Sequence, residues 1–285
     1  MACIAFATCL KFLDMQPGDA LLAGELARRD VAVRAAPWNG DFAPFAQADL
    51  VLVRSTWDYP EHATAFRGWI ARCADAGLRL FNPAALMAWN LSKDYLLDLA
   101  ARGAPLPPTR AVDPVAGSIA AAMDALGLAE AVVKPLVGAT ARGLSRVRRD
   151  DAAGLDRAAA FLGQRGLVQP VVAEIAERGE TSFVFFAGRY SHGVVKRPAA
   201  GDIRSQREFG GRVEPANPPA WAVAEARRVL SLLPEAPLYA RIDAVLLDAR
   251  LALMEVELIE PELFLTHDEG AAGRLADVLV AKLKA

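Results

Sequence analysis

The first 83 residues alternate between short apolar runs and longer segments whose apolar residues recur at helical spacing. The runs CIAFAT, VAVRAAPW, ADLVLVRST and LRLFNP are predicted to be strands, with helices over residues 18–29 and 62–77 and Asp19 as a helix cap. Strands that alternate with helices favour a parallel sheet covered on both faces. We therefore expect an N-terminal α/β domain over residues 1–83.

Polar residues gather directly after the third of these strands. Ligands bind at the carboxyl ends of the strands in open parallel sheets, and this edge carries Arg54, Ser55, Asp58 and Tyr59. Arg54 has the chemistry to bind a substrate carboxylate through two N–H groups. The alternative is an Arg54–Asp58 ion pair within the loop. These four residues are the candidates for a substrate site, and the absence of a GxGxxG motif gives a dinucleotide site little support.

After Pro83 the pattern becomes that of one long helix. Residues 85–103 have strong helical spacing, include Lys93 and end at a glycine. The segment GAPLPPTRAV follows, and its prolines predict an extended connector into a new subdomain.

A glycine-bearing loop follows the next apolar strand. The strand AVVKP contains Lys134, and the loop after it contains Gly138 and Gly143. This arrangement suits a polyphosphate, because an ammonium group neutralises phosphate oxygens and loop N–H groups donate hydrogen bonds to them. An ordinary β-hairpin turn explains the same pattern, and no Walker motif is present.

The stretch from 239 to 264 reads as a hairpin that carries three acids. Its strands, YARIDAVLL and LALMEVELI, are joined by a tight turn at 248–250. Glu255 and Glu257 are two residues apart, so they share a face of their strand. With a three-residue loop, Asp243 lies directly opposite Glu255.

Three carboxylates so close together in an apolar sheet are costly unless positive charge lies among them. Mg²⁺ meets this need, because it is a hard cation that binds carboxylate oxygens and completes its shell with phosphate. The alternative is a surface hairpin whose acids face water.

Composition excludes several other classes of protein. The 285 residues are 54% hydrophobic and 23% charged, with a net charge of −2, which fits a compact soluble protein without a nucleic-acid partner. No uninterrupted apolar run reaches about 18 residues, so no membrane span is expected. The three cysteines form no CxxC pair and the N-terminus lacks a basic signal-peptide region, which favours reduced thiols in the cytoplasm.

Five separate motifs, in this order, resemble the ATP-grasp superfamily on its glutathione-synthetase-like side. They are SKDYLLDLAARGAPLPPT, VVKPLVGATARG, VQPVVAEIAERGETSFVFFAG, KRPAAGDIRSQREFGG, and RIDAV with MEVELIEP. Their spacing is especially similar to that of the ligases that close O-ureido-D-serine to D-cycloserine. The resemblance implies an ATP-grasp fold behind the N-terminal domain. It places a linker helix and small subdomain at 84–168, and a large subdomain with the acidic hairpin at 169–285.

The resemblance also implies how a nucleotide is held. Lys93 and Lys134 look like the lysines that bind its phosphates, and the loop from Gly138 to Gly143 looks like the one that closes over them. This loop has fewer glycines than in many members of the family.

The base and the ribose are assigned in the same way. Gln169 and Val172 look like the hinge residues whose backbone reads adenine, while Pro170 between them has no N–H to donate. Glu180 looks like the acid that binds the ribose.

Metal ligands and catalytic cations complete the implied site. The magnesium ligands would be Asp243, Glu255 and Glu257, where the family often has Asn at the last position, so one or two ions are expected, with Mn²⁺ as a substitute. The basic residues around the transferred phosphate would be Arg197, Arg204 and Arg241.

The implied activity is an ATP-dependent ligase or cyclo-ligase. Such an enzyme phosphorylates a carboxylate or ureido carbonyl of a small amino-acid-like substrate and releases ADP and phosphate as a C–N bond or ring forms. Two alternatives stay open: a dipeptide-type carboxylate–amine ligase, and an ATP-binding regulatory protein without turnover. The intact set of lysines and acids argues against the second, and a homodimer is common among relatives.

Overall fold

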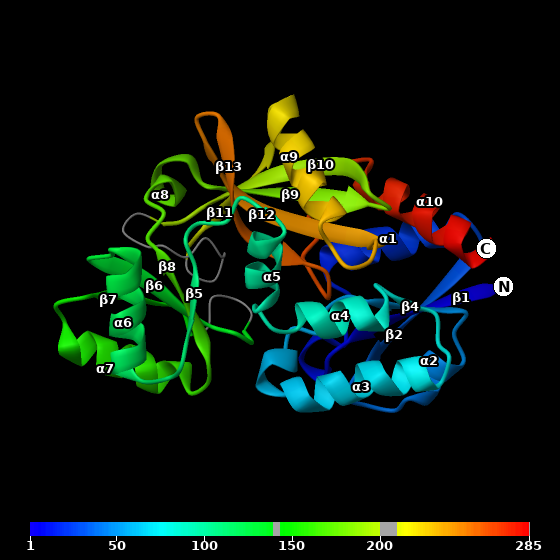
Figure 1. Cartoon of the computed structure of the whole chain (residues 1–285). Coiled ribbons are helices and arrows are strands. Elements are labelled where there is room, and N and C mark those ends of the chain that lie inside the picture. The colour runs from blue at the N-terminus through cyan, green and yellow to red at the C-terminus, as the bar shows by residue number, and fades with distance from the viewer. Residues whose placement is uncertain (139–142, 200–209, 285) are drawn as a thin grey trace.

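The computed structural model describes residues 1–138, 143–199 and 210–284. Three sheets, each flanked by helices, make up the molecule (Figure 1). This mixed α/β architecture, with one parallel and two antiparallel sheets, confirms the predicted fold class.

The N-terminal sheet is parallel, as the alternation of strands and helices predicts. Its strands, in sheet order, are β2 (Val31–Pro37), β1 (Ala2–Thr8), β3 (Leu50–Val53) and β4 (Leu80–Phe81). Its helical segments are α1 (Pro17–Ala27), α2 (Ala43–Ala46) and α3 (Ala63–Asp75), with short 3₁₀ turns at Leu10–Phe12 and Tyr59–Glu61.

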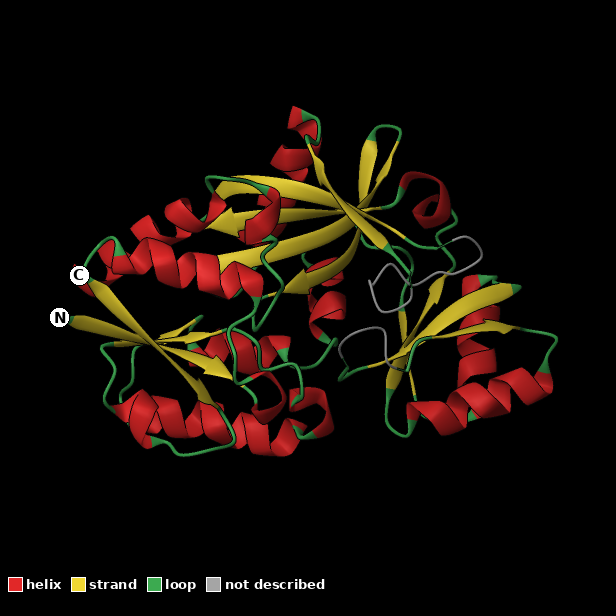
Figure 2. Cartoon of the chain, turned by 180° about the vertical axis from the view of Figure 1, so that it is seen from behind, coloured by secondary structure: helices red, strands yellow, loops and turns green. Residues whose placement is uncertain are grey.

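The second sheet is antiparallel and has its helices on one side (Figure 2). Its strands, in order, are β5 (Arg110–Val112), β8 (Gly166–Pro170), β6 (Glu130–Pro135) and β7 (Ser145–Arg148), and its helices are α6 (Ala116–Leu126) and α7 (Ala152–Leu162). The predicted boundary between residues 168 and 169 falls inside β8, which pairs with β5 and β6.

The third sheet is also antiparallel and carries the acidic hairpin. In order, its strands are β11 (Arg212–Ala216), β10 (Arg189–Arg197), β9 (Glu180–Phe186), β12 (Tyr239–Leu247) and β13 (Arg250–Glu257). Around it lie α8 (Glu174–Arg178), α9 (Ala220–Ser231), a 3₁₀ turn at Leu265–His267 and α10 (Ala271–Lys284). None of the helices in the described part of the chain is long and apolar enough to cross a membrane.

The long helix predicted over residues 85–103 is wrong, because the structure has two helices, α4 (Ala84–Asn90) and α5 (Tyr95–Ala101). Tertiary hydrogen bonds replace helical ones at the break. The Asn90 amide donates to the carbonyl of Val256 at 2.9 Å, and the backbone N–H of Lys93 donates to the carbonyl of Leu136 at 2.8 Å. Lys93 therefore lies in the turn between the helices and not on a helix.

The predicted opposition of Asp243 and Glu255 is confirmed, but the turn differs from the one expected. Leu247 pairs with Arg250, so the loop has two residues, and a bulge after Asp243 restores the register that a three-residue loop would give. Bulges re-aim side chains beside active sites. Here the bulge keeps the acids on one face.

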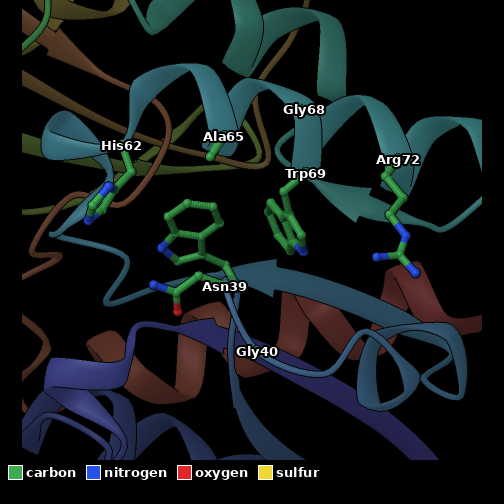
Figure 3. A pocket seen from close by; sticks show the side chains of 8 residues that line it. Asn39, Gly40, His62, Ala65, Gly68, Trp69 and Arg72 are labelled. Atoms are coloured by element: carbon green, nitrogen blue, oxygen red, sulfur yellow. The ribbon is translucent and has the colours of Figure 1, made fainter.

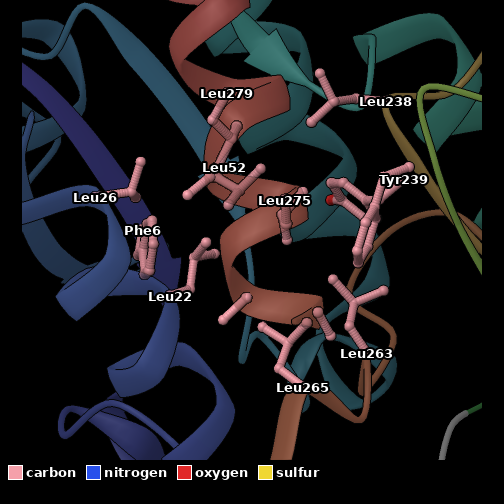
Figure 4. Packing of buried hydrophobic residues seen from close by; sticks show 14 of the residues in the cluster. Phe6, Leu22, Leu26, Leu52, Leu238, Tyr239, Leu263, Leu265, Leu275 and Leu279 are labelled. Carbon is pink, nitrogen blue, oxygen red and sulfur yellow. The ribbon is translucent and has the colours of Figure 1, made fainter. Parts of the chain in front are cut away.

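Apolar residues from both ends of the chain join the N-terminal sheet to the third sheet. Figure 4 shows this cluster, in which Phe6, Leu22 and Leu52 pack with Leu275 of α10 and Tyr239 of β12. The buried Tyr239 hydroxyl lies within hydrogen-bond distance of carbonyls on both sides of the junction, 2.6 Å from that of Ile259 and 3.1 Å from that of Val53. The carboxyl edge of the parallel sheet is therefore held against the segment that follows β13.

Candidate active site

One face of the β12–β13 hairpin combines acids with an arginine. Arg241 pairs across the strands with Glu257, and Asp243 with Glu255. The Arg241 guanidinium donates to Asp243 at 3.0 and 2.9 Å and also contacts Glu257. Asp243 is 1% exposed. Asp243 therefore does not face bulk water, as the surface alternative would require, while the side chains of Glu255 and Glu257 are 30% and 28% exposed.

A lysine from β10 enters the same cluster. The register of β9 and β10 sets Lys196 opposite Glu180, and its ammonium lies 2.7 Å from both Glu180 and Asp243. The Ser182 hydroxyl donates to the other oxygen of Asp243 at 2.6 Å. The Lys196 ammonium is therefore shared by Glu180, which is predicted to bind ribose, and Asp243, which is predicted to bind metal.

Lys93 reaches the hairpin from the break between α4 and α5. Its ammonium lies 2.5 Å from Glu255 and 3.0 Å from the carbonyl of Gly138. The linker, the hairpin and the start of the glycine loop therefore meet at one side chain, as the prediction of a phosphate-binding Lys93 requires.

Lys134 differs from the other cations of the site. It has no hydrogen-bond or ion-pair partner among the residues that the structure describes. Burial lowers the pKa of its ammonium to about 8, against a partial opposing effect of the Glu255 carboxylate. A half-buried ammonium without a counter-ion is suited to binding an anion.

The pKa values of the hairpin acids differ widely. Burial raises the pKa of Glu257 to about 7, with nearby Glu255 and Asp243 adding to the rise against the opposing effect of Arg241. Burial would raise the pKa of Asp243 too, but the Arg241 and Lys196 cations hold it well below its ordinary value. The charged form is therefore disfavoured by burial at Glu257, whereas two cations favour it at Asp243.

The hairpin acids fit Mg²⁺ by their chemistry, because carboxylate oxygens are the hard ligands that this ion prefers. A bound cation would favour the ionised form of Glu257, which burial disfavours. As they stand, these oxygens face Lys93, Lys196 and Arg241. Among residues 1–138, 143–199 and 210–284, no three His, Cys, Asp or Glu side chains are arranged to hold a metal ion.

The remaining residues of the predicted nucleotide site lie at the second sheet and its hinge. Gln169 is buried in β8, where its amide donates to Thr109 at 2.8 Å. The carbonyl of Val172 accepts from the N–H of Ile175 at 3.2 Å. Gly143 has a φ of +85°, and a Cβ there would lie 2.8 Å from the Pro135 ring, so this position requires glycine.

Of the predicted phosphate-side arginines that the structure describes, Arg241 lies in the cluster and Arg197 does not. Arg197 is exposed and donates to the carbonyl of Glu177 at 3.2 Å, because β10 directs Lys196 and Arg197 to opposite faces. Arg204 lies outside the described residues. Lys196 is not among the predicted site residues, although the register of the β9–β10 hairpin sets it opposite Glu180.

Three of the four candidate substrate residues form hydrogen bonds or ion pairs within the N-terminal domain. Arg54 pairs with Asp19 at 2.7 Å, and Ser55 donates to the same carboxylate at 2.8 Å, all of them buried. The alternative Arg54–Asp58 ion pair is therefore wrong. Asp58 instead accepts from the indole N–H of Trp38 at 2.7 Å. Only one nitrogen of Arg54, the buried Nη1, is without a partner.

Tyr59 stacks on Phe66 with ring centroids 4.8 Å apart, and Phe66 packs in turn on Trp38 and Trp69. These two tryptophans border a hollow of about 490 Å³ (Figure 3). Trp38 and Trp69 line it from the loop after β2 and from α3. None of its lining residues belongs to the acidic hairpin.

Comparison with known proteins decides the family. The chain is 33% identical over 267 residues to the cycloserine biosynthesis protein DcsG of Streptomyces lavendulae, covering 87% of each chain. The chain belongs to the DcsG family of ATP-grasp ligases. The family model for the DcsG N-terminal domain matches residues 4–82 of this DcsG-family chain.

Solved structures agree with this assignment. The crystal structure of the D-cycloserine synthetase DcsG superposes with a TM-score of 0.87 at 29% identity, covering 99% of this chain and 100% of that one. A D-alanine–D-alanine ligase from Bacillus anthracis superposes with a TM-score of 0.74 at 16% identity, covering 100% and 97%, which shows a shared fold. This DcsG-family chain is an ATP-dependent, C–N bond-forming ligase.

Proposed function

We propose that this DcsG-family enzyme phosphorylates a carboxylate or ureido carbonyl of a small amino-acid-like substrate and then closes a ring. The observation that supports this most is the set of cations around one face of the β12–β13 hairpin. They come from separate segments of the chain: Lys93, Lys134, Lys196 and Arg241.

These residues supply what phosphoryl transfer asks of a protein, which is positioning and positive charge. Lys134 would pair with the phosphates of ATP, which would favour the charged form that burial disfavours. Lys93 would hold them from the opposite side, next to the carbonyl of Gly138. Arg241, fixed by Asp243 and Glu257, would stabilise the charge that develops on the transferred phosphoryl group.

Mg²⁺ is the proposed metal, as one or two ions with Mn²⁺ able to replace it, held by Asp243, Glu255 and Glu257. It would supply charge neutralisation at the phosphates. For the nucleoside, we propose Gln169 and Val172 at the adenine and Glu180 at the ribose. The free Cys3, Cys9 and Cys73 agree with a reducing compartment such as the cytoplasm.

Ring closure is favoured over joining two amino acids by the relatives, which are named for cycloserine synthesis. The dipeptide-type ligase stays the second candidate, because the D-alanine–D-alanine ligase shares the fold.

The test is ADP release from Mg·ATP with O-ureido-D-serine alone, followed by analysis of the product. Release of ADP together with a cyclic product is the expected result. A strict requirement for a second amine would favour the dipeptide-type ligase. Nucleotide binding without ADP release from any amino-acid substrate would favour a regulatory protein and overturn the proposal.

A further inference from the structure

The segment that follows β13 is fixed at three consecutive carbonyl groups. The Tyr239 hydroxyl donates to that of Ile259 at 2.6 Å, the Trp57 indole to that of Glu260 at 3.1 Å, and Arg54 to that of Pro261 at 3.4 Å. Two of these donors follow strand β3 of the N-terminal sheet. The backbone of Glu260 is therefore held between the predicted substrate edge and the acidic hairpin.

The carboxylate of Glu260 has no cation of its own. The residue is 8% exposed, and its side chain makes no ion pair with any residue that the structure describes. Its own backbone N–H is the donor that faces it. The nearest site cations, Lys93 and Arg241, are already engaged by Glu255, by Asp243 and by Glu257.

Burial raises the pKa of the Glu260 carboxyl group to about 8, since its charged form is costly there without a counter-ion. A ligand that supplies positive charge would favour the ionised form. The surroundings restrict what that ligand can be. Glu260 lies three residues beyond Glu257, and its backbone carbonyl accepts from the indole of Trp57, which follows β3, so the residue lies where the hairpin meets the substrate edge. Phosphates are excluded at this point because they carry the same sign of charge.

We propose that Glu260 binds the α-ammonium group of the substrate and thereby selects α-amino acids over acids that lack the amine. This inference rests on the proposed function, since it names the substrate class of the same site. Glu260 is a specificity residue here: the ammonium is held by charge and hydrogen bonds and takes no part in the bond that forms.

The experiment measures binding, so that it does not depend on turnover. Calorimetry in the presence of Mg·ADP compares D-serine with D-glycerate, in which a hydroxyl replaces the α-amine. We expect the wild type to bind D-serine at least about 10-fold more tightly, as a charge-assisted contact predicts. Glu260→Gln should abolish this preference, while Glu262→Gln, which alters an exposed acid of the same segment, should keep it.

Two results would overturn the inference: no preference in the wild type, or an unchanged preference in Glu260→Gln. If Glu260→Gln does not fold, Glu260→Asp is used in its place. Aspartate keeps the charge on a side chain that is one methylene shorter, so this variant should weaken the preference for D-serine without removing it. ADP release with O-ureido-D-serine tests the proposed function separately. An active enzyme whose preference ignores Glu260 would overturn this inference alone.

Discussion

Two buried charge clusters in this molecule differ in how their charges are matched. At the N-terminal sheet, Arg54 and Asp19 have side chains only 5% and 4% exposed, and Ser55 completes the carboxylate shell. At the hairpin, burial raises the pKa of Glu257 to about 7 and lowers that of Lys134 to about 8. The first cluster is closed and neutral, whereas the second carries charges that its neighbours do not balance.

The difference in charge matching distinguishes a cluster that stabilises the fold from one that is suited to binding a ligand. A matched buried pair fixes two elements relative to one another, here α1 and the end of β3. Its removal leaves an uncompensated charge inside the protein. Unmatched charges lower the stability of the empty protein and are typical of sites whose ligand supplies the missing charge. Substitutions in the two clusters should therefore act on different properties.

The largest effect is expected from Glu255→Gln, which should reduce turnover by at least about 10³-fold and change the melting temperature little. Glu255 is part-exposed, with 30% of its side chain accessible, so its loss leaves no buried hole, while the phosphate side of the site loses a proposed metal ligand. Steady-state kinetics and thermal unfolding check both parts. Unfolding, with normal activity per folded molecule, would contradict a functional role for the hairpin acids.

The second prediction applies to the matched cluster. Arg54→Met should lower the free energy of unfolding by about 3–5 kcal/mol, because Asp19 is left buried and unpaired. The double variant Arg54→Met/Asp19→Leu should recover a large part of this loss, since no charge is then stranded. Urea denaturation of the single and double variants measures the coupling. Additive losses would show that the two side chains do not act as a pair.

The sequence predicted the alternation of the N-terminal sheet and the pairing of Asp243 with Glu255. These two predictions depend on local features of the sequence: the alternation of apolar and helical segments, and the spacing of the residues on either side of a hairpin turn. The break between α4 and α5 was not predictable, because Asn90 and Lys93 form hydrogen bonds with residues far along the chain.

Long-range partners were also the main source of error at the site. Asp19 was expected to cap α1, but no side-chain cap bond forms there and the carboxylate pairs with Arg54 instead. The sequence predicts Arg197 and not its neighbour Lys196 as a site residue, because sequence alone does not say which residue of a strand faces a site. The register of β10 with β9 shows that Lys196 is the residue that faces the site.

The smallest effect is expected at Lys134, and its sign distinguishes the two clusters most sharply. Lys134→Met should stabilise the nucleotide-free protein at pH 7 by about 1–2 kcal/mol, since it removes a half-buried charge whose pKa has fallen to about 8. The same substitution should weaken ATP binding. Exposed Lys282, changed to Met, is the matched control and should do neither.

The pH dependence follows from the same lowered pKa. Above pH 8 the folded protein releases the Lys134 proton, while the unfolded chain keeps it until pH nears 10.5, so the wild type should gain stability relative to Lys134→Met across that interval. Thermal unfolding of both proteins from pH 7 to 10, with and without Mg·ATP, measures this. If Lys134→Met destabilises the empty protein at pH 7, the ammonium has a partner within the protein, and the contrast between the clusters is lost.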